Sequence, residues 1–281
     1  MYAVRMTSAV VTARDVELRY GSLVAIGRSS FTIPDGSVTA LIGPNGSGKS
    51  TLLNAIAGLH EPVGGSIEIE PIDGRPRRFA YVLQTTKVNE ALPISVREVV
   101  MMGRYAGAGA YGWLRQADRD AVAEAMERIG VTALADRRLQ ELSGGQRQRV
   151  FVAQGLAQSH DLLLLDEPLT GLDLPSAQAI DDVVHSEHER GHTVVMTTHD
   201  LSEAQVADHV LLLSTRVVAQ GPPDEVLTIE HLTEAYGPSL LHVDGERLFI
   251  DDPAHRPVEG RHIHQDRTIH VESSQTERHG G

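Results

Sequence analysis

Apolar and polar positions follow two patterns along the chain, and each predicts a kind of strand. Segments 9–21, 29–33 and 66–70 mix polar with apolar residues and end near glycine or proline, as half-exposed antiparallel strands do. Other short runs are almost wholly apolar, which is typical of strands in a parallel sheet covered on both faces. These runs are 38–42, 79–83, 162–165, 193–196 and 210–213. Helical spacing predicts helices over 96–102, 118–129, 175–189 and 201–207.

The run at 38–42 leads into a glycine-rich turn and then into a predicted helix. The turn fits the phosphate-loop pattern, in which glycines let backbone N–H groups close around phosphate oxygens at a helix N-terminus. Its residues, all candidate ATP ligands, are Gly43, Pro44, Asn45, Gly46, Ser47, Gly48, Lys49, Ser50 and Thr51. The alternative is a glycine-rich helix cap without a ligand, and the flanking strand and helix favour the phosphate loop.

Two side chains of this turn have distinct expected roles. The ammonium of Lys49 is expected to lie on the β and γ phosphates, and the hydroxyl of Ser50 to ligate Mg²⁺. Lys49 is also unusual in its chain, because Lys87 is the only other lysine and the remaining basic residues are arginines.

Composition narrows the class of protein. The 281 residues are 41% hydrophobic, enough for one sizeable core with appendages or at most two modest domains. No apolar run reaches the roughly 18 residues of a membrane span, the N-terminus lacks the apolar core of a signal peptide, and there is no cysteine, so we expect a location in the cytosol. The net charge of -13 argues against extended nucleic-acid binding, although a loop of backbone donors can still hold nucleotide phosphates.

Two adjacent acidic residues, Asp166 and Glu167, follow the predicted strand at 162–165. Adjacent side chains on a strand point to opposite sides, so each can do a different task. Asp166 is expected to orient Mg²⁺, and Glu167 to act as general base on the water that attacks the γ phosphorus. Taken alone the pair could be ordinary strand-end acids, but together with the phosphate loop it favours catalysis.

The stretch Leu142-Ser143-Gly144-Gly145-Gln146 decides which kind of phosphate-loop protein this is. Ser143 could cap a helix, but two glycines in the first turns cost about 1 kcal/mol each relative to alanine, which predicts a close approach to that backbone. The stretch matches the LSGGQ signature, and the chain from about Val10 to Tyr236 resembles the ATP-binding subunits of ABC transporters.

The resemblance assigns further positions. Tyr20 resembles the aromatic residue that stacks on adenine, and Gln84 the glutamine that reaches Mg²⁺ and the permease side. Asp173 resembles the aspartate of the D-loop, and His199 the switch histidine on the γ phosphate. A lone tyrosine or histidine is more often structural, but these motifs occur in the family's order.

The resemblance also implies a fold and an assembly. The expected fold is α/β: a P-loop NTPase (RecA-like) core with an antiparallel β subdomain and an inserted α-helical signature subdomain. The domain would span 8–240, with its helical part at about 85–158. Beyond the resemblance, Asp244-Gly245 between two apolar runs predicts a small hairpin, and the polar, aperiodic sequence from Asp251 predicts a disordered tail, together at 241–281. Two subunits would form a homodimer in which Ser143, Gly144, Gly145 and Gln146 complete the partner's ATP site in trans. Permease subunits in the membrane would be separate chains, an extracytoplasmic metal-binding protein would act indirectly, and the subunit would lie on the cytoplasmic face of the cell membrane.

Two short stretches bear on which substrate such a transporter would import. Residues 102–105 and 112–115 resemble the manganese, zinc and iron importers, although iron-siderophore importers have a similar Gly-Arg motif. The alternative cargo is therefore an iron-siderophore complex or haem. Two further functions compete with import: a soluble ABC ATPase without a transport role, and a phosphate-loop kinase or GTPase, against which LSGGQ argues. The tail carries five of the chain's 14 histidines, and their scatter favours a solvated segment over a metal site. They are His255, His262, His264, His270 and His279.

Overall fold

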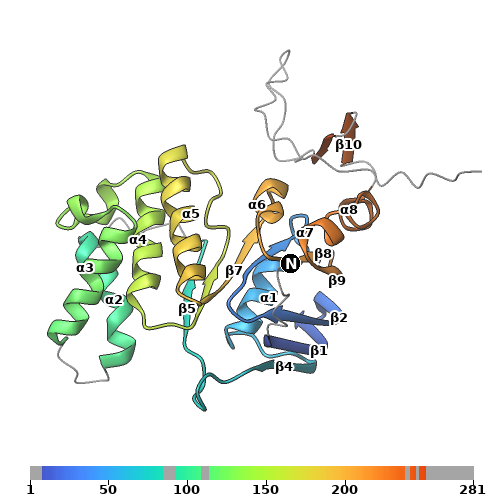
Figure 1. Cartoon of the computed structure of the whole chain (residues 1–281), viewed down its shortest axis with the longest axis horizontal. Helices are drawn as coiled ribbons and strands as arrows, with labels where there is room; N and C mark the ends of the chain where they lie inside the picture. Colours follow the sequence, from blue (N-terminus) through green and yellow to red (C-terminus); the bar gives the residue numbers. More distant parts are fainter. Residues whose placement is uncertain (1–7, 85–92, 109–113, 238–240, 245–246, 251–281) are drawn as a thin grey trace, which may run out of the picture.

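A computed structural model describes residues 8–84, 93–108, 114–237, 241–244 and 247–250. Two sheets lie on one side of the molecule and a group of helices on the other (Figure 1). Within the described residues no helix is both long enough and apolar enough to span a membrane.

The central sheet has six strands in the order β5-β6-β7-β3-β8-β9. Its strands are β5 (Phe79–Val82), β6 (Leu162–Leu165), β7 (Thr193–Thr198), β3 (Val38–Ile42), β8 (His209–Leu213) and β9 (Val217–Gly221). The first five pair in parallel, and β9 pairs antiparallel with β8. β6, β7 and β8 are buried along their whole length, which explains their continuous apolar sequences.

A second, antiparallel sheet has the order β2-β1-β4. Its strands are β1 (Ala9–Tyr20), β2 (Leu23–Pro34) and β4 (Gly64–Ile69), so the strand expected over 29–33 begins six residues earlier. The expected hairpin is present as β10 (Leu241–Asp244) paired antiparallel with β11 (Arg247–Ile250).

Helix α1 (Lys49–Ile56) packs between the two sheets. Its Leu52 and Leu53 share one core cluster with Val10 and Phe31 of the antiparallel sheet and with Leu211 of the central sheet. The opposite layer covers β3 and β8 with α6 (Leu201–Gln205), α7 (Pro223–Val226) and α8 (Ile229–Tyr236). The strong apolar packing on both faces fixes the turn from β3 into α1, and so fixes the phosphate loop.

The helical part contains α2 (Val96–Ala108), α3 (Gln116–Arg128) and α4 (Gly144–Ala157), with 3-10 turns at Thr132–Leu134 and Leu139–Glu141. α5 (Leu174–Glu189) lies beside α4 and covers the sheet (Figure 1). Val99 and Val150 belong to the same buried cluster as Leu163 and Leu165 of β6. The helical part therefore shares its core with one face of the central sheet.

Gly103 and Arg104 belong to the stretch that resembles metal importers, and both contribute to the packing of these helices. A Cβ on Gly103 would lie 2.3 Å from the backbone oxygen of Gln154, so only glycine lets α2 approach α4 this closely. The Arg104 guanidinium bonds the carboxylate of Asp118 on α3 at 2.8 Å and donates to the carbonyl of Ala157 on α4 at 2.9 Å. The pair has a structural role in packing α2, α3 and α4.

Candidate nucleotide site

Four motifs meet at one edge of the central sheet because each follows one of four adjacent parallel strands. Gln84 follows β5, Asp166 and Glu167 follow β6, His199 follows β7, and the loop 43–51 follows β3. Carboxyl ends of neighbouring parallel strands share an edge, where α/β sheets bind their ligands. Residues spread over more than a hundred positions of sequence are thereby gathered around the phosphate loop.

The helix that follows the phosphate loop begins without a side-chain cap. Helix α1 begins at Lys49, and its N-cap Gly48 has φ 99° and provides no capping side chain. The first N–H groups of α1 therefore point out of the helix without a side-chain partner, as an anion site requires. The Lys49 ammonium is buried and donates to the carbonyl of Gly43 at 2.8 Å. Burial lowers the pKa of Lys49, and the carboxylates of Glu167 and Asp166 partly offset this.

Different physical causes require glycine at different positions of the loop. A Cβ on Gly43 would lie 2.1 Å from the backbone oxygen of Leu213, and one on Gly48 would lie 2.4 Å from the side chain of Ile26. These two positions need glycine because of packing within the chain. Gly46 has φ 81° but open space around it, so its requirement is the backbone conformation.

Asp166 is held by two hydroxyl groups. Its Oδ1 accepts a hydrogen bond of 3.0 Å from Ser50 and one of 2.7 Å from Thr197, and the residue is 6% exposed. A serine hydroxyl and a carboxylate at this spacing are hard oxygen donors of the kind that Mg²⁺ binds.

Glu167 leaves the strand instead of continuing it. Its φ is 46°, in the left-handed region that non-glycine residues rarely adopt, so Asp166 and Glu167 diverge because the backbone turns and not because strand side chains alternate. The N–H of Glu167 donates to the hydroxyl of Thr197 at 2.7 Å, and its Oε2 accepts from the amide of Gln84 at 2.5 Å. The Glu167 carboxylate is thus fixed beside the phosphate loop.

The residues of the LSGGQ signature lie at the start of α4. Ser143 caps α4: its hydroxyl accepts from the N–H of Gln146 at 3.2 Å, and the Gln146 side-chain oxygen accepts from the N–H of Ser143 at 3.1 Å. A Cβ on Gly145 would lie 2.4 Å from Asp173, whereas one on Gly144 would meet no heavy atom within 4 Å. The close approach predicted for both glycines is thus present only at Gly145, where it comes from Asp173 of the D-loop and Ser176 of α5, while Gly144 faces open space. Figure 1 shows α4 among the helices, away from α1.

Tyr20 and His199 both expose their side chains to solvent. Tyr20 ends β1, is 51% exposed, and has its ring centroid 4.6 Å from that of His60. His199 directly follows β7 and is exposed.

Thr197 was not expected from the sequence. It is fully buried and links Asp166 to Glu167 through one hydroxyl group. The available signal was its place near the end of an apolar run, where a polar side chain must find a partner. The tail histidines, from His255 to His279, lie outside the described residues.

Comparison with known proteins decides the family. The model of the ABC transporter family matches residues 26–170. The chain belongs to the ABC transporter family. It is an ABC transporter ATPase, and such proteins bind ATP.

Three relatives have metal transport in their names. The chain is 42% identical over 228 residues to the chelated iron transport system membrane protein YfeB of Yersinia pestis, covering 78% of this chain and 76% of that protein. It is 39% identical to the manganese transport system ATP-binding protein MntA of Synechocystis, covering 76% and 84%. It is 40% identical to the zinc transport system ATP-binding protein TroB of Treponema pallidum, covering 92% and 100%.

A solved relative is dimeric. The ATP-binding cassette MJ0796, in a post-hydrolysis state bound to ADP and phosphate, matches with a TM-score of 0.64 and 26% identity. The match covers 76% of this chain and 98% of that one. This ABC ATPase therefore shares its fold with a cassette that forms dimers.

Proposed function

We propose that this protein is the ATP-hydrolysing subunit of an import complex for manganese or zinc. The observation that carries the ATPase part is the gathering of Ser50, Asp166 and Glu167 at one edge of the sheet, with Ser50 and Asp166 in direct contact. The cargo part rests on the similarity to manganese and zinc transport proteins over most of the chain.

Mg²⁺ fits the oxygen donors at this edge. Ser50 and Asp166 would hold the ion, and the Gln84 side-chain oxygen would complete the set from β5. When bound with ATP, Mg²⁺ supplies charge compensation on the phosphate oxygens. Lys49 and the N–H groups at the start of α1 would bind the same phosphates.

Glu167 is suited to be the general base. Its backbone is fixed by Thr197 and its carboxylate by Gln84, so it can accept a proton from a water at the γ phosphate without first reorienting. His199, exposed at the end of the neighbouring strand, would contact the γ phosphate when ATP is bound and lose this contact after hydrolysis. Tyr20 would stack on the adenine.

A second copy of the chain would complete each site. Ser143, Gly144, Gly145 and Gln146 begin a helix that lies apart from the phosphate loop of its own chain, and the N-terminus of α4 can serve as an anion site. The Ser143 hydroxyl accepts one bond as a cap and keeps its own hydrogen to donate. The backbone at Gly144 is open for a phosphate. Asp173 lies beside Gly145, so it would couple the two nucleotide sites of the dimer.

Membrane subunits would be separate chains on which this subunit docks at the cytoplasmic face. The described helices include none that can span a bilayer, and the helical part exposes apolar side chains at Met102 and Tyr105. Exposed apolar groups on α2 suit contact with a permease. An extracytoplasmic metal-binding protein would deliver the ion on the other side.

The cargo is tested in cells that lack the subunit. We expect lower manganese or zinc content by mass spectrometry, slow growth under chelation, and recovery when that ion is added. The parent gene should restore uptake, whereas a Glu167→Gln copy should not. Normal manganese and zinc together with reduced siderophore or haem uptake would overturn this cargo and support chelated iron, the cargo that the name of YfeB favours.

A further inference from the structure

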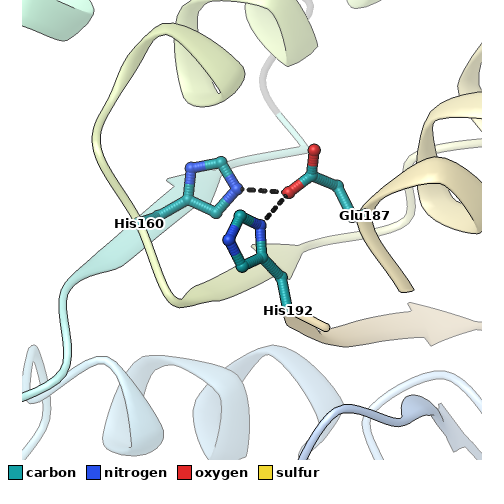
Figure 2. A group of neighbouring side chains, drawn as sticks. All are labelled: His160, Glu187 and His192. Atoms are coloured by element: carbon teal, nitrogen blue, oxygen red, sulfur yellow. Dashed lines mark hydrogen bonds and ion pairs between the residues drawn. The ribbon is translucent and has the colours of Figure 1, made fainter. Parts of the chain in front are cut away.

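The side chains of His160, Glu187 and His192 lie together (Figure 2). The two histidines precede strands β6 and β7, so the cluster lies at the edge of the central sheet opposite the nucleotide motifs, which follow these strands. His160 precedes β6, His192 precedes β7, and Glu187 lies on the last turn of α5. One ring nitrogen from each histidine and one carboxylate oxygen all lie within 4.8 Å of one another. Neither the nucleotide chemistry nor the signature uses these residues.

We propose that His160, Glu187 and His192 form a binding site for a divalent transition-metal ion, with zinc the best match. Nε2 of His160 lies 2.8 Å and Nδ1 of His192 lies 2.6 Å from the same oxygen, Oε2 of Glu187. Two imidazole nitrogens and one carboxylate oxygen are a known donor set for zinc.

The bonding of His160 leaves a place for a cation. Its Nδ1 is 2.8 Å from the carbonyl oxygen of Gln158, which can only accept, so Nδ1 carries a proton. In the neutral ring Nε2 then directs a lone pair at the Glu187 carboxylate, and this contact is favourable only with a positive charge between the two atoms. A proton or a metal ion can supply that charge.

The surroundings of the three donors match those of metal ligands. Ligating histidines usually donate their second ring nitrogen to a carbonyl or carboxylate, as His160 does to Gln158. The other carboxylate oxygen of Glu187 accepts from Arg128 of α3 at 2.5 Å, which fixes its orientation and leaves Oε2 for the metal. Glu187 is fully buried, so these contacts hold it in a single place.

The site also has an entrance and some freedom to adjust. The side chain of His192 is 32% exposed, so an ion and a water ligand can reach the cluster from solvent. Donors around tetrahedral zinc lie roughly 3.3 Å apart for bonds of about 2.0–2.1 Å. Relative to Glu187 Oε2, the His192 nitrogen would move outward by about 0.7 Å and the His160 nitrogen by about 0.5 Å. His192 lies in a turn after Gly191, where a Cβ would meet nothing within 4 Å.

The test measures Zn²⁺ binding by the full chain, stripped of metal and free of nucleotide, at pH 7.5. Isothermal titration and metal analysis would compare the parent with His192→Ala and His160→Gln. His185→Ala is the matched control, because it removes a histidine of α5 outside the cluster. Circular dichroism checks that each variant is folded, and the parent chain is the reference for sites elsewhere, including the tail. Because no transport or ATPase assay is involved, failure here leaves the proposed function untouched.

We expect each cluster variant to lose one zinc per chain or to bind it at least tenfold more weakly, with His185→Ala equal to the parent. Co²⁺ in the parent should give the visible absorption of a tetrahedral site, and both cluster variants should lose it. Mn²⁺, which favours oxygen donors, should bind more weakly than Zn²⁺. Equal zinc stoichiometry and affinity in the parent and in folded His192→Ala and His160→Gln would overturn the site and leave an ion-pair network.

Discussion

The hydroxyl of Ser50 donates a hydrogen bond of 3.0 Å to the carboxylate of Asp166, although 116 positions separate the two residues in the sequence. The contact joins the start of α1 to the end of β6, so two motifs that can be recognised separately form one site. Phosphate binding and water activation then depend on different members of that site, and substitutions can separate them.

Lys49→Ala and Glu167→Gln are expected to affect different steps. Lys49→Ala removes the buried ammonium at the phosphate loop and should weaken or abolish ATP binding. Glu167→Gln should leave ATP binding intact and stall hydrolysis, because only the proton acceptor is lost. Nucleotide binding and phosphate release measure the two steps. Turnover of Glu167→Gln within about twofold of the parent, under roughly 0.5 kcal/mol, would exclude Glu167 as the base.

Thr197→Val tests whether the buried hydroxyl positions the two carboxylates. The change nearly conserves volume but removes the donor to Asp166 and the acceptor for the N–H of Glu167. Loss of these buried bonds, at about 1–3 kcal/mol, should lower kcat by roughly 10- to 100-fold. Thr197→Ser keeps the hydroxyl and should stay near the parent. A kcat of Thr197→Val equal to that of Thr197→Ser would remove this positioning role.

Asp118→Asn tests the joint between α2 and α3. The backbone N–H of Arg115 and the side chain of Arg104 lower the pKa of Asp118 in the folded protein. A lowered folded-state pKa stabilises the fold above the unfolded value of about 4, and this contribution is lost as pH falls. Asp118→Asn should therefore lower Tm at pH 7, and the deficit should persist down to about pH 4 and shrink as the pH falls below it. Asp136→Asn, at a side chain 91% exposed, is the control and should leave Tm unchanged. A deficit that did not depend on pH would contradict the role of the charge.

The elements of this fold that depend on local sequence could be predicted. Loop 43–51, residues Asp166 and Glu167, and the apolar runs of β6 to β8 were predictable because each depends on neighbouring residues in a fixed pattern. Short elements near the end of the domain, such as β9, were not anticipated because five half-buried residues give no clear periodicity.

The contacts between distant segments could not be predicted. Thr197 gains its role only when β7 lies beside β6, and Gly103 matters only because α4 crosses α2. His160 and Glu187 are 27 positions apart and meet only because the end of α5 lies beside the start of β6. Single-sequence patterns report burial and turns, whereas these sites depend on which elements become neighbours.

The last prediction concerns the shared site of the proposed dimer. In a head-to-tail pair each site combines one chain's phosphate loop with the other's signature, so Ser143→Arg and Lys49→Ala homodimers should both be inactive. Mixed dimers contain one site built from the intact halves of each variant, and an equal mixture should regain up to about a quarter of the parental hydrolysis. Mixing Lys49→Ala with Glu167→Gln is the matched control. Both changes lie on the phosphate-loop side, so no intact site can form and no activity should return. Recovery in neither mixture, with mixed dimers present by mass spectrometry, would contradict a site completed in trans by Ser143.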